Sequence, residues 1–169
     1  MNPTTEFNTQ RTLHEVVPNV FQTMLGLSLT PIAGDGPLTE ANRMGGTVGV
    51  AGDTVTGTIY VHLPETLARL AVNAMMGNPP GQTVEENDVN DVVGELTNMI
   101  GGGFKSALCD AGRPCAMSTP SVSGAPISSK RRRTCARRYF TSNSRISDWS
   151  WKSTLSSNNQ RKTYENTQC

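Results

Sequence analysis

Histidine, cysteine and aromatic residues are scarce in this sequence, which has two histidines, four cysteines and 5% aromatic residues. Neither His14 nor His62 lies near a cysteine pair at a zinc-ligand spacing, so the sequence carries no zinc-site motif. The irregularly spaced cysteines form no disulfide framework, which favours a reducing setting. No run approaches the roughly 20 apolar residues of a membrane-spanning helix, and the polar N-terminus lacks a secretion signal. We therefore expect a cytoplasmic protein with no membrane segment and no metal or cofactor of its own.

The charged residues are divided unevenly along the chain. Residues 1–122 hold five basic and twelve acidic residues, a net charge of −7, whereas residues 123–169 hold ten basic and two acidic residues, a net charge of +8. The 169 residues suffice for one domain with a buried core and are too few for two ordinary domains. We therefore predict a flexible N-terminus over 1–10, one domain over 11–122 and a basic, disordered tail over 123–169.

Hydrophobic periodicity predicts the elements of the domain. Apolar residues at helical spacing predict a helix over 11–26, kinked or begun near Pro18, and a helix over 64–77 with Met75 in its buried stripe. Alternation on either side of Gly52-Asp53 predicts a hairpin. The expected strands are 27–32, 45–51, 55–63 and one within 113–122. These patterns predict an α/β fold of the α+β type, in which long helices pack on an antiparallel sheet.

The longest predicted helix begins at Thr83 and ends near Leu108. Thr83 and Glu86 have the spacing of a capping box, in which two side chains satisfy free backbone N–H groups at the start of a helix. At about 100° per residue, most apolar residues of this helix fall on one side, and Met99 is among them. We therefore expect one buried face and one polar face.

Four residues form a row on the polar face of this helix, and we call them the polar row: Asp91, Glu95, Asn98 and Gly102. Lys105 lies beside the row. Gly102 is the middle one of three consecutive glycines, each of which costs a helix up to about 1 kcal/mol relative to alanine. Its missing side chain leaves a gap next to Asn98 that lets a partner surface approach closely. By itself the row is typical of a solvated helix face, and no histidine, nucleophilic cysteine or metal cluster accompanies it.

The row belongs to a longer pattern, Asp91-x3-Glu95-x2-Asn98, which is followed by Pro120 after 21 intervening residues. This pattern resembles the signature of the CheC/CheX/FliY chemotaxis phosphatases. The segments "ELTNMIGGGFKSAL" and "GTIYVHLPETLARLAVNAMMG" resemble CheX in particular. The resemblance covers about residues 11–122. It implies a phosphatase that hydrolyses the phospho-aspartate of a CheY-like response regulator and so ends a chemotaxis signal.

The resemblance also implies a role for the residues of the pattern. Asn98 is expected to be catalytic, because its amide both donates and accepts hydrogen bonds and can orient the attacking water. Glu95 is expected to share in catalysis and in partner binding by pairing with the active-site lysine of the regulator. Asp91 is expected to contact the partner, and Pro120 is expected to shape the fold. The regulator supplies the acyl phosphate and holds the Mg²⁺, and a homodimer like that of CheX is also allowed.

Two other functions stay open from the residues alone. The first is a non-catalytic domain that binds a response regulator or a flagellar partner. The second is a nucleic-acid binder that uses the basic tail, although we favour the response regulator as the partner. A phosphate-binding loop at "GGGFKSA" is disfavoured, because Phe104 separates Gly103 from Lys105 and the segment continues a helix.

The basic segment over 123–169 has little apolar periodicity. It is a basic arm, a disordered tail or the product of a frameshift, and we favour the frameshift. Codons can be chosen for "DWSWKSTLSSNN" so that reading from the third base gives "LVVEVHFKFK" and a stop. The same shift in "RRRTCARRYFTSN" permits "EEDVRQEVLHFE", and both strings alternate as strands do. This hypothesis predicts a change of frame near Val122 and a sheet that lacks its final two strands.

Overall fold

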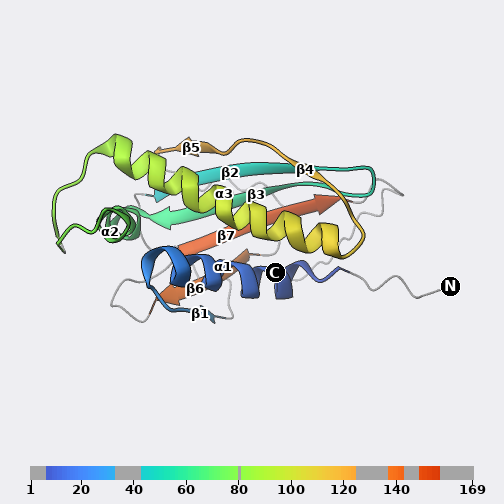
Figure 1. Ribbon diagram of the computed structural model, residues 1–169, viewed down its shortest axis with the longest axis horizontal. Helices are drawn as coiled ribbons and strands as arrows, with labels where there is room; N and C mark the ends of the chain where they lie inside the picture. The colour runs from blue at the N-terminus through green and yellow to red at the C-terminus, as the bar shows by residue number, and fades with distance from the viewer. Residues whose placement is uncertain (1–6, 33–42, 80, 125–136, 143–148, 157–169) are drawn as a thin grey trace, which may run out of the picture.

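A computed structural model describes the chain at residues 7–32, 43–79, 81–124, 137–142 and 149–156. These residues form three α-helices and seven β-strands (Figure 1). The helices are α1 (Thr9–Leu25), α2 (Glu65–Met76) and α3 (Glu86–Asp110). The strands are β1 (Leu29–Ile32), β2 (Arg43–Ala51), β3 (Thr56–Pro64), β4 (Ala116–Met117), β5 (Ser121–Ser123), β6 (Arg137–Ser142) and β7 (Trp149–Ser156). In these ranges, no helix combines the length and the apolar content that crossing a membrane requires.

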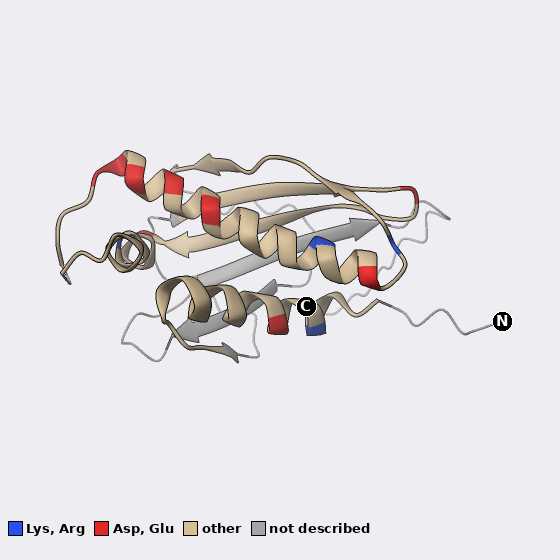
Figure 2. Ribbon diagram, viewed as in Figure 1, with Lys and Arg blue, Asp and Glu red and all other residues tan. Residues whose placement is uncertain are grey.

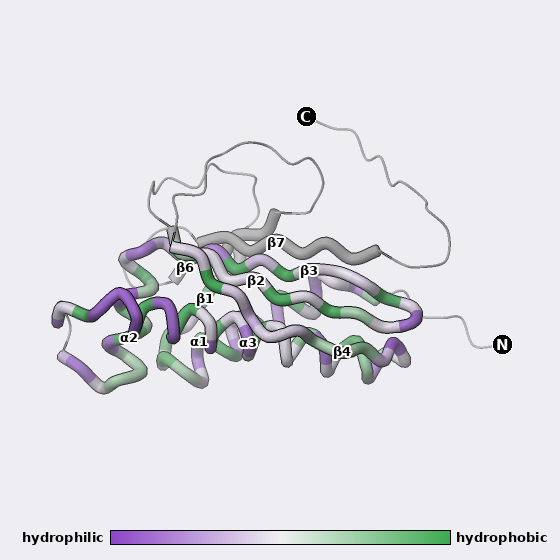
Figure 3. Tube along the Cα trace, turned by 90° about the horizontal axis from the view of Figure 1, so that it is seen from above, coloured by the Kyte–Doolittle hydropathy of each residue, from purple (hydrophilic) through white to green (hydrophobic). Residues whose placement is uncertain are grey.

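The strands form one antiparallel sheet in the order β1-β6-β7-β3-β2-β4, and β5 also pairs with β2. The predicted hairpin lies inside this sheet, since β2 and β3 pair along their whole length and the Gly52 N–H donates to the Val55 carbonyl at 2.7 Å in the turn. All three helices cover the same face of the sheet (Figure 3). The predicted α+β fold, with helices packed on an antiparallel sheet, is confirmed.

The core lies between the sheet and the helices. Because side chains alternate across a strand, β3 buries Ile59, Val61 and Leu63 toward the helices, while the residues between them stay partly exposed. Phe21 of α1 and Phe104 of α3 are among the largest side chains that are fully buried. Burying each such side chain contributes about 1.5–3 kcal/mol, so this layer is the main source of stability.

Asparagine and glycine mark the ends of the first two helices. Asn8 caps α1 by accepting a backbone hydrogen bond of 2.9 Å. Gly26 and Gly77 follow α1 and α2 with φ of 65° and 68°, a conformation that glycine adopts without steric cost. The cap places the start of α1 at Thr9, so the last two residues of the predicted flexible N-terminus belong to the helix, and Pro18 lies inside it.

The predicted capping box at the start of the longest helix is wrong. Helix α3 begins at Glu86, and its N-cap is Glu85, whose side chain makes no capping hydrogen bond. Val84 is buried, and its carbonyl accepts a hydrogen bond of 3.1 Å from Arg69 Nη1, so the segment before Glu85 is held outside the helix. Thr83 therefore stays exposed ahead of the N-cap.

Two strands of the sheet come from the basic segment. β7 pairs with β3, and β6 lies between β7 and β1. The expectation that the sheet lacks its final two strands is therefore wrong. Backbone pairing requires no particular side chain, and β7 covers the edge that β3 would otherwise expose. The rest of the segment predicted to be a disordered tail (125–136, 143–148 and 157–169) and residues 1–6 lie outside the described residues.

Strands β6 and β7 fall within the two stretches whose shifted reading alternates as a strand does. In the register, Ser153 stands opposite Ile59, Trp151 opposite Val61 and Leu155 opposite Gly57. The shifted string "LVVEVHFKFK" covers positions 149 to 158, so it supplies valine, valine and phenylalanine at these three positions. Its alternation therefore has the phase that the core-facing side of β3 requires. The frameshift stays a hypothesis, which this agreement of phase supports.

We predict that replacing residues 149–158 by LVVEVHFKFK stabilises the protein. The replacement puts valine in place of Ser153, the one polar residue among the three that stand opposite Gly57, Ile59 and Val61, and an added apolar side chain contributes on the order of 1 kcal/mol when buried. The melting temperature, measured by calorimetry, should rise by about 2–4 °C.

The matched control for this replacement is the same string rotated by one position, KLVVEVHFKF. It has the same composition, but it puts glutamate and histidine at positions 153 and 155. This variant should be no more stable than the original chain, because its apolar residues are out of phase with β3. Equal melting temperatures for the two replacements would contradict the phase argument.

Candidate functional site on helix α3

Helix α3 is held on three sides and open on the fourth. β2 and β3 lie beneath it, α1 and α2 lie along one side, and β4 and β5 lie along the other (Figure 1). Its buried residues are Val89, Val92, Val93, Leu96, Thr97, Ile100, Gly101, Phe104 and Leu108. The remaining face of the helix is therefore available for contact with another molecule.

A glycine of the sheet brings α3 close to β2. A Cβ atom added to Gly46 would overlap the side chain of Thr97, so the two elements meet where β2 has no side chain. Thr97 is fully buried, and its hydroxyl donates a hydrogen bond of 2.7 Å to the Val93 carbonyl. The polar group in this contact is therefore satisfied, and the contact fixes how α3 is turned about its own axis.

The polar row lies on the open face of α3. Asp91 and Glu95 are exposed, whereas Asn98 and Gly102 are half-buried. With a rise of 1.5 Å per residue, Glu95 and Asn98 lie about 4.5 Å apart along the axis. In the described part of the chain, no hydrogen bond or ion pair occupies the side chains of Asp91, Glu95 and Asn98. The structure thus brings the four residues onto one surface, where their polar groups are free to engage a partner.

Charge is distributed unequally along α3 (Figure 2). Five carboxylates occupy its N-cap and N-terminal half: Glu85, Glu86, Asp88, Asp91 and Glu95. Lys105 is the single cation of the helix. Among the described residues the two ion pairs, Arg11–Glu15 and Arg69–Glu65, lie on α1 and α2. The acidic residues suit the positive end of the helix dipole, and none of them takes part in these two ion pairs.

The thiol of Cys115, beyond the end of α3, is not an activated nucleophile. Burial raises the pKa of the Cys115 thiol, and the neighbouring Cys109 thiol raises this pKa further, while Lys105 acts in the opposite direction. A nucleophilic thiol needs a lowered pKa. Within the described ranges, no group of three or more His, Cys, Asp and Glu residues is placed to hold a metal ion. The side chains of the polar row offer hydrogen-bonding groups and negative charge.

Pro120 lies at the edge of the sheet and not on the polar row. Val50 pairs with Met117 and Thr47 with Ser121, so three steps along β2 correspond to four steps from β4 to β5. The extra residue makes a β-bulge, and Pro120 lies within it. Proline has no N–H to donate to a ladder, so it fits this interruption of an edge strand.

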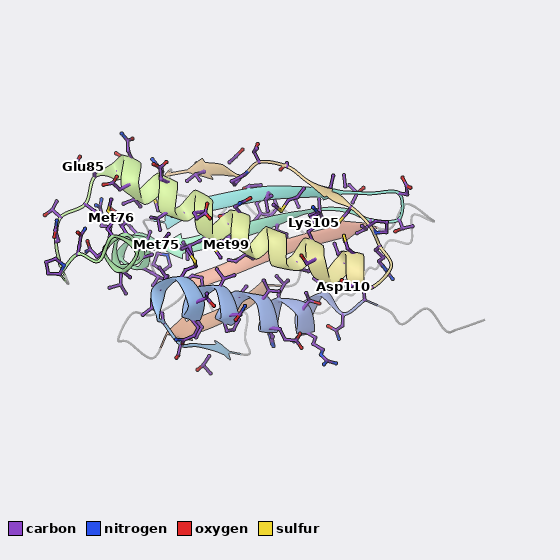
Figure 4. All side chains as sticks on the ribbon, viewed as in Figure 1. Met75, Met76, Glu85, Met99, Lys105 and Asp110 are labelled. Atoms are coloured by element: carbon purple, nitrogen blue, oxygen red, sulfur yellow. The ribbon has the colours of Figure 1, made fainter. Side chains whose placement is uncertain are left out.

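Three methionines, Met75, Met76 and Met99, form an apolar border beside the polar row that periodicity does not predict, and we call it the methionine border. Periodicity assigns Met75 and Met99 to buried stripes, but both are only half-buried. Figure 4 shows Met75 of α2 and Met99 of α3 on the side of α3 that faces α1 and α2. Met76 is 57% exposed. Methionine side chains adapt their shape to a partner, so this border suits protein docking beside Asn98. The adjacent pair Met75-Met76 is the signal in the sequence that could have found it.

Comparison with protein families gives one match that covers more than half of the chain. The family model described as "Chemotaxis phosphatase CheX" matches residues 44–139. The matched segment contains the whole polar row and Pro120. No curated protein matches the chain.

Solved structures resemble the chain over most of its length. Chemotaxis protein CheX from Vibrio vulnificus is 26% identical, with a TM-score of 0.71, over 92% of this chain and 100% of that chain. CheX from Desulfovibrio desulfuricans is 25% identical, with a TM-score of 0.69, over 86% of this chain and 97% of that chain. A chain of the CheX-CheY-BeF3-Mg+2 complex from Borrelia burgdorferi is 14% identical, with a TM-score of 0.65, over 88% of this chain and 97% of that chain. The last likeness shows the fold alone.

We predict that Gly46→Ala destabilises the protein by about 1–3 kcal/mol, the range of overpacking in a core. The added methyl group overlaps Thr97, and α3 must shift to admit it. Urea denaturation should show the loss as a lower midpoint with an unchanged slope.

Gly49→Ala on the same strand is the matched control. Its Cβ would lie 3.6 Å from Ser118 Oγ, which is an ordinary contact distance, so the urea midpoint should stay close to that of the original chain. If the two variants lose equal stability, the close contact at Gly46 does not position α3.

Proposed function

The chain belongs to the CheX chemotaxis phosphatase family, and on this premise we propose that it hydrolyses the aspartyl phosphate of a CheY-like response regulator. The observation that carries the proposal is the open polar row on α3, in which Glu95 and Asn98 stand one turn apart with free side chains. The Borrelia burgdorferi complex of CheX with CheY, BeF3 and Mg+2 supports the choice of partner. This function places the chain in the cytoplasm, where the regulator acts.

The reaction needs little from protein side chains. The oxygen of a water molecule attacks phosphorus, the bond from phosphorus to the aspartyl oxygen breaks, and the aspartate leaves as a carboxylate. Because the pKa of that carboxyl group is about 4, its departure needs no proton donor. The protons of the water pass to the inorganic phosphate and to solvent. Phosphoryl transfer depends mostly on positioning and electrostatics, so a site without histidine can accelerate it.

We assign to Asn98 the role of orienting the attacking water. Its Oδ1 can accept a hydrogen bond from that water, and its Nδ2 can donate one to a phosphoryl oxygen. The side chain is half-buried on α3, so its backbone is fixed while its amide still reaches outward. Holding a reactant in line with the bond that breaks can contribute several kcal/mol to catalysis.

We assign to Glu95 the role of docking the regulator. Its carboxylate would pair with the active-site lysine that the family resemblance implies for the regulator. It stands about 4.5 Å from Asn98 along the helix axis, so both side chains can enter one cleft of the partner. Asp91, one turn further toward the N-terminus, extends the negative surface and speeds the encounter with a cationic patch. The Mg²⁺ expected on the regulator would neutralise charge on the phosphoryl oxygens.

A non-catalytic domain that binds the regulator is the second candidate. The acidic row and the methionine border are docking features, and neither requires chemistry. Turnover separates the two functions, because only an enzyme accelerates the decay of phosphorylated regulator when the regulator is in large excess over the chain.

We predict that Asn98→Ala lowers turnover by at least about 100-fold, the loss that follows removal of one positioned hydrogen-bonding group from an active site. The measurement is release of inorganic phosphate from phosphorylated regulator in excess over the chain. The melting temperature should change little, because truncation on the open face creates no core cavity.

Asn19→Ala on the exposed face of α1 is the control, since it makes the same chemical change away from the polar row. It should keep full turnover. Full turnover in Asn98→Ala would refute the role given to that amide. If the original chain binds the regulator but does not accelerate its dephosphorylation, the second candidate, a non-catalytic binding domain, is the correct function.

We predict that Glu95→Gln weakens regulator binding by tenfold or more. A desolvated hydrogen bond to a charged group contributes about 1.5–3 kcal/mol, and 1.4 kcal/mol corresponds to a factor of ten. Calorimetric titration with a regulator activated by beryllium fluoride and Mg²⁺ measures the affinity without turnover.

Glu86→Gln is the control for this experiment, because Glu86 is exposed on the same helix but points about 140° away from Asp91 around the axis. It should change the affinity less than twofold. If both variants bind equally well, the row is a solvated face and Glu95 does not dock the regulator.

A further inference from the structure

The three consecutive glycines of α3 differ in what surrounds them. A Cβ atom at Gly101 would lie 2.8 Å from Val48 Cγ1, and one at Gly103 would lie 2.8 Å from Val16 Cγ1. Both distances are shorter than real contacts of this kind, so these two glycines are required by packing against β2 and α1. A Cβ atom at Gly102 would meet nothing within 4 Å. The packing of this chain therefore gives no reason for a glycine at position 102.

The backbone gives no reason for this glycine either. The described glycines with positive φ are Gly26, Gly77, Gly81 and Gly112, so Gly102 has a backbone conformation that any L-residue adopts. It also lies in the interior of a 25-residue helix, where glycine is the poorest helix former after proline. An alanine would fit the space and favour the helix. The missing side chain is thus a cost to the free chain that nothing within the described structure offsets.

The position of Gly102 on the helix surface suggests what benefits from the gap. Residues three and four positions away are neighbours on a helix, so Asn98 and Met99 border the gap on one side and Lys105 and Ser106 on the other. An amide, a thioether, an ammonium group and a hydroxyl thus surround a half-exposed stretch of bare backbone. This notch adjoins the amide that the proposed function assigns to the attacking water.

We propose that Gly102 is a positioning residue, whose bare backbone admits the regulator loop next to the aspartyl phosphate. The proposal rests on the proposed function above. A side chain at this position would hold the loop away by about the length of one carbon–carbon bond, ~1.5 Å, and a misplacement of about 1 Å can cost about 100-fold in rate. Lys105 stands at the rim, where its charge complements the phosphoryl group and the carboxylates around it. The occupant is therefore the backbone of the phosphorylated regulator.

The test compares Gly102→Ala and Gly102→Leu with the original chain. Both substitutions favour the helix, so the melting temperature should rise by about 2–4 °C. The value of kcat/KM for phosphorylated regulator should nevertheless fall at least tenfold for alanine and further for leucine. A purely structural role for this position would predict that stability and activity move together, whereas this proposal predicts that they move in opposite directions.

Two controls isolate the effect of the notch. Thr23→Ala, at an exposed position of α1, also favours a helix and should raise the melting temperature without changing turnover. Gly103→Ala makes the same chemical change one residue along α3 and should lower the melting temperature, because its methyl group meets Val16.

Several outcomes would overturn the proposal. Turnover within twofold of the original in both Gly102 variants would show that no partner occupies the notch, and a lower melting temperature would show that the space is not open. If Gly102→Leu, in the absence of regulator, sediments with a different oligomeric state from the original chain, the notch is occupied by a second copy of this chain. If the original chain shows no turnover, the proposed function is wrong. In that case, titration of the Gly102 variants with regulator activated by beryllium fluoride still tests the notch, and unchanged affinity overturns it.

Discussion

The close contact between α3 and the central hairpin is the constraint on which the rest of the structure depends. Gly46 of β2 has no side chain where Thr97 of α3 packs, and Gly101 of α3 has none where Val48 of β2 packs. Protein interiors are packed as densely as organic crystals, so a helix held this closely has one orientation about its axis. That orientation buries the apolar side of α3 and leaves the polar row, with Asn98 at its centre, on the outside. The candidate site is therefore a consequence of how the core packs.

A rigid helix suits a reaction in which the partner brings the reactive group. The acyl phosphate and its metal ion belong to the proposed regulator, and this chain contributes an amide and carboxylates in a fixed geometry. A side chain on a packed helix loses little freedom when the partner docks, so most of the binding energy remains available for orientation. The thiol of Cys115 stays outside this chemistry, because burial raises its pKa. The methionine border offers adaptable apolar contact next to the polar one.

Strand β7, from the basic segment, lies at a position in the sheet that calls for apolar residues. β7 lies between β3 and β6, so the residues that stand opposite the core-facing side of β3 are expected to be apolar. Two of these positions hold apolar residues, Trp151 and Leu155. The third holds Ser153, which stands opposite the fully buried Ile59. The shifted reading places an apolar residue at all three positions. A segment whose composition suits a tail therefore lies where an alternating strand belongs, and a change of reading frame accounts for both facts.

Features that depend on neighbours along the chain could be predicted from the sequence. A period of 3.6 residues places the polar row on one face of a helix, alternation identifies β2 and β3, and Gly77 marks the end of α2 because a left-handed turn there favours glycine. Contacts between distant residues decided the rest. α3 begins at Glu86 because Arg69 holds the carbonyl of Val84 outside the helix, and β7 joins the sheet through the backbone of β3, so neither follows from local pattern. The three consecutive glycines of α3, residues 101–103, are the same residue type. The helical period places Gly102 in the polar row, but only the tertiary structure shows that Gly101 and Gly103 are required by packing and Gly102 is not, because this depends on the atom that each would meet across the helix surface.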